Sequence, residues 1–409
     1  MHRSPSYDAR LVGWLSLAQL ISWGSVFYTF AVLMEPMERE LGLNRAESSL
    51  AFSLALLAEG LLAYPVGRLI DRGHERFVMT AGSVLIGCCL LLHSQISTAW
   101  AFYAVWLGLG AGLAATLYPP VFAVVTRRFP LDYRRAIITM TFLGGLASTV
   151  FIPLSAWLIQ ALGWRHALWV LAALHLLLCA PLHALALRGA PRTHGPQSKS
   201  VQDQNDKLTQ LLRSPPFLLI GAFIVLLMAV TAALPAHMVS LLRENGLGEA
   251  WAIAIPASIG LIQVAGRALM YFFEHRFDLH QANRHIPLLI PLGVFALLAS
   301  PWLGEGQLWL VFLFVLLFGL GNGMLTIVKG TAIAQYVSRD HVASLNGALG
   351  LPTALARAAS PLVLGLLWSQ QAGYRHGLWL LLAGGLLGVA SLVLAQRLSL
   401  QASTRARRG

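Results

Sequence analysis

Long apolar runs alternate with short polar stretches along the whole 409-residue chain. Each run is long enough to cross a bilayer, because a helix rises about 1.5 Å per residue and the hydrocarbon core, roughly 30 Å thick, requires about 20 residues. The pattern predicts transmembrane helices over 11–34, 46–66, 77–96, 100–126, 136–160, 167–187, 216–241, 250–273, 286–303, 307–333, 343–369 and 375–397. The first run is too long for a cleavable signal, so we expect it to remain a helix. The predicted fold class is therefore an all-α membrane protein with twelve transmembrane helices.

One polar stretch stands out by its length. It contains RGAPRTHGPQSKSVQDQNDK, which mixes Pro, Gly, Ser and both signs of charge. Such a composition cannot bury a core, so it is typical of a linker. We expect an N-terminal six-helix bundle over 1–187, a cytoplasmic linker over 188–214 and a C-terminal six-helix bundle over 215–409.

The two halves share sequence landmarks. The segment GWRHALW at 163–169 returns as GYRHGLW at 373–379, and glycines alternate at 108, 110 and 112 and again at 319, 321 and 323. Matched landmarks at a nearly constant offset predict an internal repeat, which is a transporter architecture. The glycines predict close helix packing rather than a nucleotide loop, since no strand precedes them and no Lys-Ser/Thr closes a phosphate cradle.

Composition supports a membrane protein and excludes a soluble one. The chain is 57% hydrophobic and 11% charged, with a mean hydropathy of +0.67, whereas soluble domains carry about 25% charged residues. The net charge of +12 is dispersed in short clusters, so we expect no nucleic-acid partner. Most Lys and Arg fall on the side that carries both termini and the linker, which predicts that this side is cytoplasmic. We expect a bacterial inner (plasma) membrane and a monomer.

The segment GRLIDRGHER, which runs from Gly67 to Arg76, follows the second predicted helix. It resembles the signature between helices 2 and 3 of the major facilitator superfamily. His74 and Glu75 stand where that signature has a glycine and a basic residue. The resemblance implies two bundles that rock between inward-open and outward-open states, and an Asp71–Arg72 charge relay that steadies the outward-open state.

A finer resemblance concerns FYTFAVLMEPMERELGLNR, which spans Phe27 to Arg45. It is similar to the monocarboxylate and oxalate–formate porter branch, in which an acid and an Arg four residues later in helix 8 engage a carboxylate. Here these positions are Gln263 and Arg267, so the Arg is kept and the acid is lost. The resemblance implies Arg267 as an anion contact and includes Gln263 in the predicted site.

Charges near the middle of a membrane helix are costly and are candidates for function. Arg357 and Glu59 lie near the centres of predicted helices 11 and 2. In the resembled family these helices meet, so we expect the two side chains to pair and to exchange partners during transport. Protonation of Glu59, or a substrate carboxylate at Arg357, would break this pair. Lys329 in helix 10 either binds an anion or extends to the interface.

Helix 1 offers polar and aromatic side chains suited to a small polar substrate, namely Gln19, Trp23 and Tyr28. The alternative for each is helix packing or lipid contact. The three cysteines lack metal or redox spacing, and the histidines at 275, 280 and 285 do not share a helix face. We therefore expect no metal, no cofactor and no enzymatic activity.

These features predict a secondary-active transporter of a small organic anion, such as a monocarboxylate, with Glu59 as the basis for proton coupling. Three of the four candidate site charges are positive, which favours an anionic substrate. The first alternative is an efflux pump for drugs or amphiphilic metabolites. Two motifs common in drug and proton-coupled members, an Arg in helix 4 and a Gly-Pro in helix 5, are missing. The second alternative is a receptor or sensor that binds without transporting.

Overall fold

The computed structural model describes residues 8–129, 133–188, 209–273, 278–338 and 342–406. Their regular elements are helical, apart from one isolated bridge between Ser369 and Gly373. The α-helices are α1 (Ala9–Ser22), α2 (Phe30–Leu41), α3 (Arg45–Leu69), α4 (Glu75–His93), α5 (Ala99–Thr116), α6 (Tyr118–Arg128), α7 (Tyr133–Gly145), α8 (Ala147–Ala173), α9 (Ala180–Ala186), α11 (Pro215–Glu244), α12 (Glu249–Phe273), α13 (Leu279–His285), α14 (Leu289–Ala299), α15 (Gln307–Tyr336), α16 (Val342–Leu366) and α17 (Arg375–Ala406). Three π-helical segments, η1 (Trp23–Tyr28), η2 (Ile70–His74) and η3 (Leu174–Cys179), and two 3-10 segments, η5 (Ile286–Leu288) and η6 (Ser300–Gly306), join some of them.

Within the described ranges, 11 continuous helical stretches are long and apolar enough to span a membrane. One of them, Ala136–Ala186, has 51 residues, about 77 Å at the rise of an α-helix and more than twice a bilayer core. Gly163 interrupts it with φ 77° and ψ 157°, a conformation that favours glycine. This stretch is therefore two spans joined at Gly163, in agreement with the predicted helices over 136–160 and 167–187, and the predicted fold class is confirmed.

The chain forms two compact units. Unit 1 comprises Met1–Gly195 and Pro235–Gly260, and unit 2 comprises Pro196–Leu234 and Leu261–Gly409. The chain passes from one unit to the other within α11 and within α12. The predicted domain boundaries at 187 and 215 stay a prediction, and most of the predicted linker lies outside the described residues.

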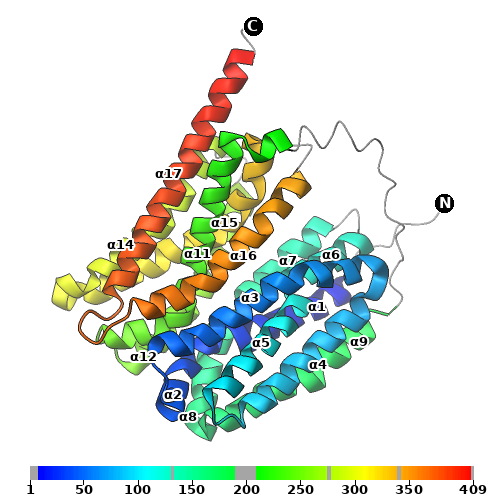
Figure 1. Ribbon diagram of the computed structural model, residues 1–409, viewed down its shortest axis with the longest axis vertical. Coiled ribbons are helices and arrows are strands. Elements are labelled where there is room, and N and C mark those ends of the chain that lie inside the picture. Colours follow the sequence, from blue (N-terminus) through cyan, green and yellow to red (C-terminus); the bar gives the residue numbers. More distant parts are fainter. Residues whose placement is uncertain (1–7, 130–132, 189–208, 274–277, 339–341, 407–409) are drawn as a thin grey trace. The chain divides into compact units, whose positions relative to one another are not determined.

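Glycines set the packing distances inside unit 1, where α3, α4 and α5 lie side by side (Figure 1). A β-carbon on Gly110 would lie 2.1 Å from the carbonyl oxygen of Ala55, and one on Gly112 would lie 2.4 Å from the side chain of Ile86. Real contacts are much longer, so only glycine permits α5 to approach α3 and α4 this closely. The predicted role of this glycine cluster is confirmed.

Unit 2 contains the same kind of close helix contact at a glycine. A β-carbon on Gly323 of α15 would lie 2.2 Å from the carbonyl oxygen of Gln263 of α12. The repeated segment also returns with the same backbone form, because Gly163 and Gly373 both have positive φ, 77° and 52°. Matched glycine conformations and matched helix contacts support the predicted internal repeat.

Candidate functional site

The first transmembrane stretch, α1–η1–α2, is not a regular α-helix. Its η1 segment begins at Trp23 and ends at Tyr28, and the amide of Thr29 donates to the carbonyl of Gly24 over 3.0 Å, five residues back. Ser25 within this segment and Thr29 directly after it bond to other helices: Ser25 Oγ lies 2.7 Å from His175 Nε2, and Thr29 Oγ1 lies 2.7 Å from Ser155 Oγ. A π-helical insertion is uncommon and is often found at functional sites.

The fourth transmembrane stretch is also interrupted, contrary to the predicted continuous helix over 100–126. Leu117 has an extended conformation (φ −76°, ψ −168°) and separates α5 from α6. The cause is the pair Pro119 and Pro120, because proline has no amide to donate and its ring clashes with the preceding turn. Pro120 leaves the Thr116 carbonyl without its helical donor, and the side chain of Gln19 supplies one through Nε2. Gln19, a predicted substrate contact, is therefore fully buried and supports this break.

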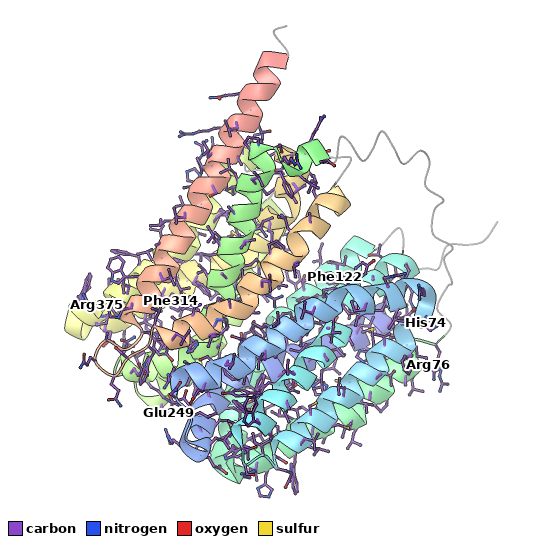
Figure 2. The ribbon with its side chains drawn as sticks, in the orientation of Figure 1. His74, Arg76, Phe122, Glu249, Phe314 and Arg375 are labelled. Carbon is purple, nitrogen blue, oxygen red and sulfur yellow. The ribbon has the colours of Figure 1, made fainter. Side chains whose placement is uncertain are left out.

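The two interruptions meet at a ring contact. Trp23, the first residue of η1, and Tyr118, the first residue of α6, have ring centroids 5.4 Å apart, and Tyr118 stacks on Phe122 at 5.2 Å. All three side chains are partly exposed (Phe122 is labelled in Figure 2). We call these three residues the aromatic platform. A β-carbon on Gly144 of α7 would lie 2.3 Å from the Tyr118 hydroxyl, so Gly144 makes room for that ring.

Other rings of unit 1 form a buried core instead. Phe30 stacks on Phe52 at 4.7 Å, and Trp106 packs edge-on against Phe30 at 4.9 Å; all three are at most 1% exposed. Tyr28, a predicted substrate contact, is partly exposed and packs edge-on against Phe27 at 5.2 Å.

Glu59 of α3 is 8% exposed. It lines a cavity of about 70 Å³ together with Leu113 and the two prolines of the α5–α6 break. Glu59 is in unit 1 and Arg357 is in unit 2, so their predicted pairing stays a prediction.

Two predicted cations come together in unit 2. Lys329 of α15 and Arg357 of α16 are both partly buried and are close enough to repel each other electrostatically. Lys329 Nζ lies 3.4 Å from Met228 Sδ of α11. By sequence, α14, α15, α16 and α17 contain no Asp or Glu, and α11 and α12 contain only Glu244 and Glu249, which belong to unit 1. The membrane helices of unit 2 thus bring cations together without supplying an acid.

The other two predicted contacts of unit 2 lie on α12. Gln263 is 7% exposed, and its backbone forms the close approach to α15. Arg267 is partly exposed and lies one turn further along the helix. Gly266 packs so closely against α15 that a β-carbon there would lie 2.9 Å from the Leu320 carbonyl.

In the segment GRLIDRGHER, Glu75 forms two ion pairs, although it was not among the predicted site residues. Glu75 is 1% exposed and lies 3.0 Å from Arg127 and 3.8 Å from Arg128. Arg72 is exposed, and the Asp71 side chain is outside what the structure describes, so the predicted relay stays a prediction. The sequence contained a signal for these pairs. Glu75 lies at the start of one transmembrane stretch and Arg127 and Arg128 end the next one, so the three residues fall on the same side of the membrane.

Arg76 of the same segment, which is labelled in Figure 2, is exposed. Its Nε donates to the carbonyl of Ala184 over 2.7 Å. Arg76 thus bonds to α9. Gly73 turns the chain at φ 84°, a value that favours glycine.

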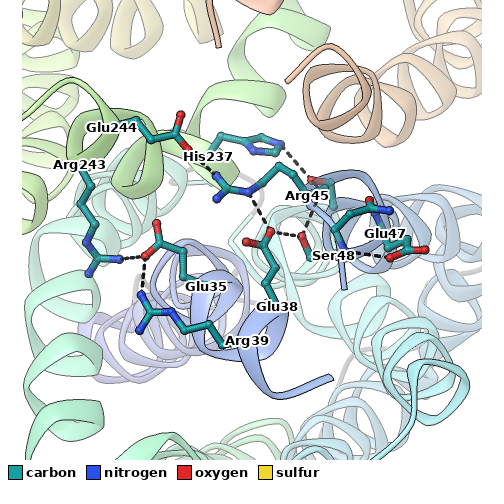
Figure 3. A network of polar contacts seen from close by, with 11 residues as sticks. Glu35, Glu38, Arg39, Arg45, Glu47, Ser48, His237, Arg243 and Glu244 are labelled. Atoms are coloured by element: carbon teal, nitrogen blue, oxygen red, sulfur yellow. Dashed lines mark hydrogen bonds and ion pairs between the residues drawn. The ribbon is translucent and has the colours of Figure 1, made fainter. Parts of the chain in front are cut away.

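A second charged network in unit 1 was not predicted (Figure 3). Arg45 pairs with Glu38 at 2.8 Å and with Glu244 at 3.4 Å. Arg243 pairs with Glu35 at 2.7 Å and with Glu249 at 2.6 Å. These pairs tie the part of α11 and α12 that belongs to unit 1 to α2 and to the start of α3.

Comparison with known proteins agrees with this architecture. The family described as Major Facilitator Superfamily matches residues 15–316. An MFS-type efflux pump of Mycolicibacterium smegmatis is 25% identical over 87% of this chain and 83% of its own length. Monocarboxylate transporter 13 of Bos taurus is 31% identical over 48% of this chain and 46% of its own length.

Solved structures show the same fold. A bacterial homolog of the human lysosomal transporter Spinster, inward-facing and unoccupied, has a TM-score of 0.74 at 18% identity and covers 98% of this chain and 99% of its own. A point mutant of the nucleoside transporter NupG has a TM-score of 0.75 at 16% identity and covers 94% of this chain and 99% of its own. The family match spans most of the chain, and the helices and repeat agree with it. The chain therefore belongs to the Major Facilitator Superfamily, as a multi-pass membrane transporter of small molecules and not an enzyme.

Proposed function

We propose that this transporter moves a small organic anion, with monocarboxylates as the first substrate class, by alternating access. The observation that carries the proposal is that two partly buried cations, Lys329 and Arg357, lie on the contacting helices α15 and α16 of unit 2. Like charges repel, and each cation away from water costs free energy, so such a pair is retained where an anion neutralises it. The membrane helices of unit 2 supply no such anion.

Two sources of negative charge fit this pair. One is a substrate carboxylate, and the other is Glu59, as the sequence predicts. The two sources are compatible. If the cations release Glu59 when they bind a substrate carboxylate, substrate binding is coupled to protonation of Glu59. Proton coupling is therefore part of the proposal, as are an inner-membrane location and cytoplasmic termini, which rest on the distribution of Lys and Arg.

The monocarboxylate class is also supported by similarity. Monocarboxylate transporter 13 of Bos taurus and monocarboxylate transporter 12-B of Danio rerio are 31% and 26% identical over the matched segments. Arg267, which the sequence analysis identified by its resemblance to a carboxylate contact, lies on α12 of unit 2. We include it as a second anion contact.

Efflux of drugs or amphiphilic metabolites is the second candidate, favoured by the efflux pump of Mycolicibacterium smegmatis, which matches over most of both chains. The two candidates differ in what the cations do. A cationic drug is repelled by Lys329 and Arg357, so neutralising them leaves its export intact or improves it. An anionic substrate loses its principal electrostatic attraction when these two cations are neutralised.

Uptake into proteoliposomes separates the candidates. Labelled mono- and dicarboxylates and a cationic dye are offered to wild type, Arg357→Gln and Lys329→Gln, with Arg397→Gln as the matched control because Arg397 is an exposed cation of the same unit. We expect carboxylate uptake to fall at least about tenfold in the first two variants, the scale of one lost charged contact. The control should match wild type. Dye transport without carboxylate uptake in wild type would replace the proposal with efflux.

A further inference from the structure

We infer that a cavity inside unit 2 is a binding site for one acyl chain of an anionic membrane phospholipid, whose phosphate lies at Arg375. The cavity has a volume of about 250 Å³ and is lined by residues within 226–230 of α11, 356–367 of α16 and 377–384 of α17. All three segments belong to unit 2, and their helices are labelled in Figure 1. The inference concerns a lipid rather than the transported solute, so it does not rest on the proposed function.

The lining of this cavity is apolar. It consists of Leu, Val, Ala and Gly residues, apart from Ser360. Ser360 Oγ donates to the carbonyl of Arg357 over 3.1 Å, within its own helix, so its proton is not offered to a ligand. Apolar cavities of about 150 Å³ stay dry and take up apolar molecules. The cavity therefore suits a hydrocarbon chain and not a charged solute.

Small residues leave this space between the helices. Ala359 of α16 and Gly384 of α17 both line it, and a β-carbon on Gly384 would have nothing within 4 Å. One turn further along α17 the packing is tight, because a β-carbon on Gly388 would lie 2.2 Å from the side chain of Leu227 of α11. Protein interiors are close-packed, so a gap of this size between helices requires an occupant to restore the missing contacts.

The depth of the cavity matches one leaflet of a bilayer. α17 begins at Arg375, and Gly384 is the last residue of α17 that lines the cavity. The helix rises about 13.5 Å between these two residues, close to half of a hydrocarbon core of roughly 30 Å. The cavity thus starts at one end of a transmembrane helix and reaches about as deep as the acyl chain of a lipid in the nearer leaflet.

The rim of the cavity adjoins an apolar surface. Leu380 lines the cavity and is 49% exposed. Leu387 is also exposed and lies seven residues further along α17, so the two side chains share a helix face. An acyl chain from the bilayer therefore has an entry past Leu380.

The membrane end of the cavity carries a positive charge. Arg375 is exposed and lies two residues before Gly377, the first residue of α17 that lines the cavity (Arg375 is labelled in Figure 2). The connection between α16 and α17 reads LWSQQAGY and contains no Asp or Glu, while its Trp368 and Tyr374 are of the types that favour the membrane interface. Arg binds phosphate oxygens through paired donors, so this end suits an anionic headgroup.

The internal repeat supports an external partner for Arg375. Its counterpart in the first copy of the repeated segment is Arg165, which pairs with Glu40 and donates to the carbonyls of Ser94 and Ile96. Within the described ranges, the Arg375 side chain forms no ion pair or hydrogen bond. The same residue type at the same place in the repeat thus serves the fold in unit 1 and is available to a phosphate in unit 2.

Photo-crosslinking of the purified full chain in detergent tests this inference. The probes are phosphatidylglycerol, which is anionic, and phosphatidylethanolamine, which is zwitterionic, each with a diazirine in the middle of one acyl chain; adducts are mapped by mass spectrometry. We expect phosphatidylglycerol to label the cavity lining well above Leu292 and Phe295, exposed apolar residues of α14 that report background. It should label the lining about fivefold more than phosphatidylethanolamine does, the factor of one Arg beside an anionic headgroup.

Filling the cavity should remove this labelling. Gly384→Leu fills it from α17 and Ala359→Leu fills it from α16. Each should lower labelling of the lining at least about tenfold, the factor for excluding about two methylene groups, and should leave the α14 background unchanged. Gly347→Leu is the matched control, because Gly347 of α16 also has open space but does not line the cavity. It should be labelled like wild type.

The headgroup is tested separately. Arg375→Gln should lower labelling by phosphatidylglycerol to the level of phosphatidylethanolamine, whereas Arg397→Gln, which removes an exposed cation near the other end of α17, should keep the difference. These results together with loss of labelling in the filling variants would support the inference. Labelling of the lining no higher than the α14 background, or unchanged in both filling variants, would overturn it. Equal labelling by the two lipids in wild type would overturn the anionic headgroup. None of these results bears on carboxylate transport, so the proposed function is tested independently.

Discussion

Arg243 Nη1 lies 2.7 Å from Glu35 Oε2 and joins the end of α11 to α2 within unit 1. The same guanidinium forms two bonds with Glu249, through Nε at 2.8 Å and Nη2 at 2.6 Å. Arg45 bridges Glu38 and Glu244 in the same way. These ion pairs therefore hold the adjoining ends of α11 and α12 against α2 and the start of α3 within unit 1.

Removing the centre of this network should measurably destabilise the protein. Arg243→Gln loses a partly buried ion pair with Glu35 and a second pair with the exposed Glu249, so we expect the free energy of unfolding to fall by about 1 kcal/mol. Arg39→Gln is the matched control, because Arg39 also pairs with Glu35, at 3.5 Å, but its side chain is 79% exposed. It should change stability by less than about 0.5 kcal/mol. Equal effects of the two variants would contradict the assigned role of Arg243.

Glu75→Gln should have a larger effect. Its carboxylate is buried between two arginines, and loss of one partner from a buried ion pair costs about 3–5 kcal/mol, because the remaining charge is left uncompensated. Thermal unfolding in detergent can be followed with a thiol-reactive dye in a Cys88→Ser background, because Cys88 is exposed whereas Cys89 and Cys179 are buried until the protein unfolds. Arg72→Gln, at an exposed position of the same segment, should melt like wild type. A Glu75→Gln variant as stable as wild type would show that the pair is dispensable.

The repeated glycine contacts give a symmetric prediction. Gly110→Ala and Gly323→Ala each place a β-carbon within about 2.2 Å of a backbone carbonyl, which cannot move aside as a side chain does. Both variants should fail to give folded protein on size-exclusion chromatography. Gly13→Ala and Gly347→Ala, where nothing lies within 4 Å, should fold normally. If Gly323→Ala folds and Gly110→Ala does not, the two halves do not depend on glycine contacts in the same way.

Gln19→Leu tests whether Gln19 supports the helix break. Leu keeps the volume but removes the donor to the Thr116 carbonyl, so we expect a loss of about 1–3 kcal/mol from an unsatisfied buried acceptor. If Gln19 instead contacts substrate alone, substrate affinity should fall while the melting temperature stays at the wild-type value. Thermal unfolding and binding, measured on the same preparation, separate these cases.

The helices of this protein could be predicted because each apolar run is long enough to cross a bilayer and Lys and Arg mark its ends. The interruptions within the helices could not be predicted, because a hydropathy pattern contains no information on backbone geometry. The Tyr-Pro-Pro sequence at 118–120 was the available signal for the break at Leu117. No such sequence signal indicates the π-helical segment that begins at Trp23. Trp23 was predicted as a substrate contact only as one of the polar and aromatic side chains of helix 1, and Tyr118 and Phe122 were not predicted.

Isolated charges were the ones that the sequence marked as candidates, and their role in binding stays a prediction. Lys329 and Arg357 stand out within apolar helices, and the structure brings them together in unit 2. Glu75, Arg45 and Arg243 lie at helix ends, where charges are common and sequence does not reveal which of them pair. Their partners are up to 208 residues away in sequence, as for Arg243 and Glu35, so only the folded chain identifies them.

Proton-coupled carboxylate transport is tested most directly by substrate-driven proton flux in proteoliposomes that contain a pH-sensitive dye. We predict that adding a monocarboxylate changes the internal pH with wild type by more than in protein-free liposomes. Arg357→Gln should abolish this transporter-dependent change, and Glu59→Gln should allow uptake without it. Arg397→Gln should retain the full signal. A folded wild-type protein that neither takes up nor binds any mono- or dicarboxylate would overturn anion transport, and an Arg357→Gln variant that transports like wild type would overturn the role of Arg357.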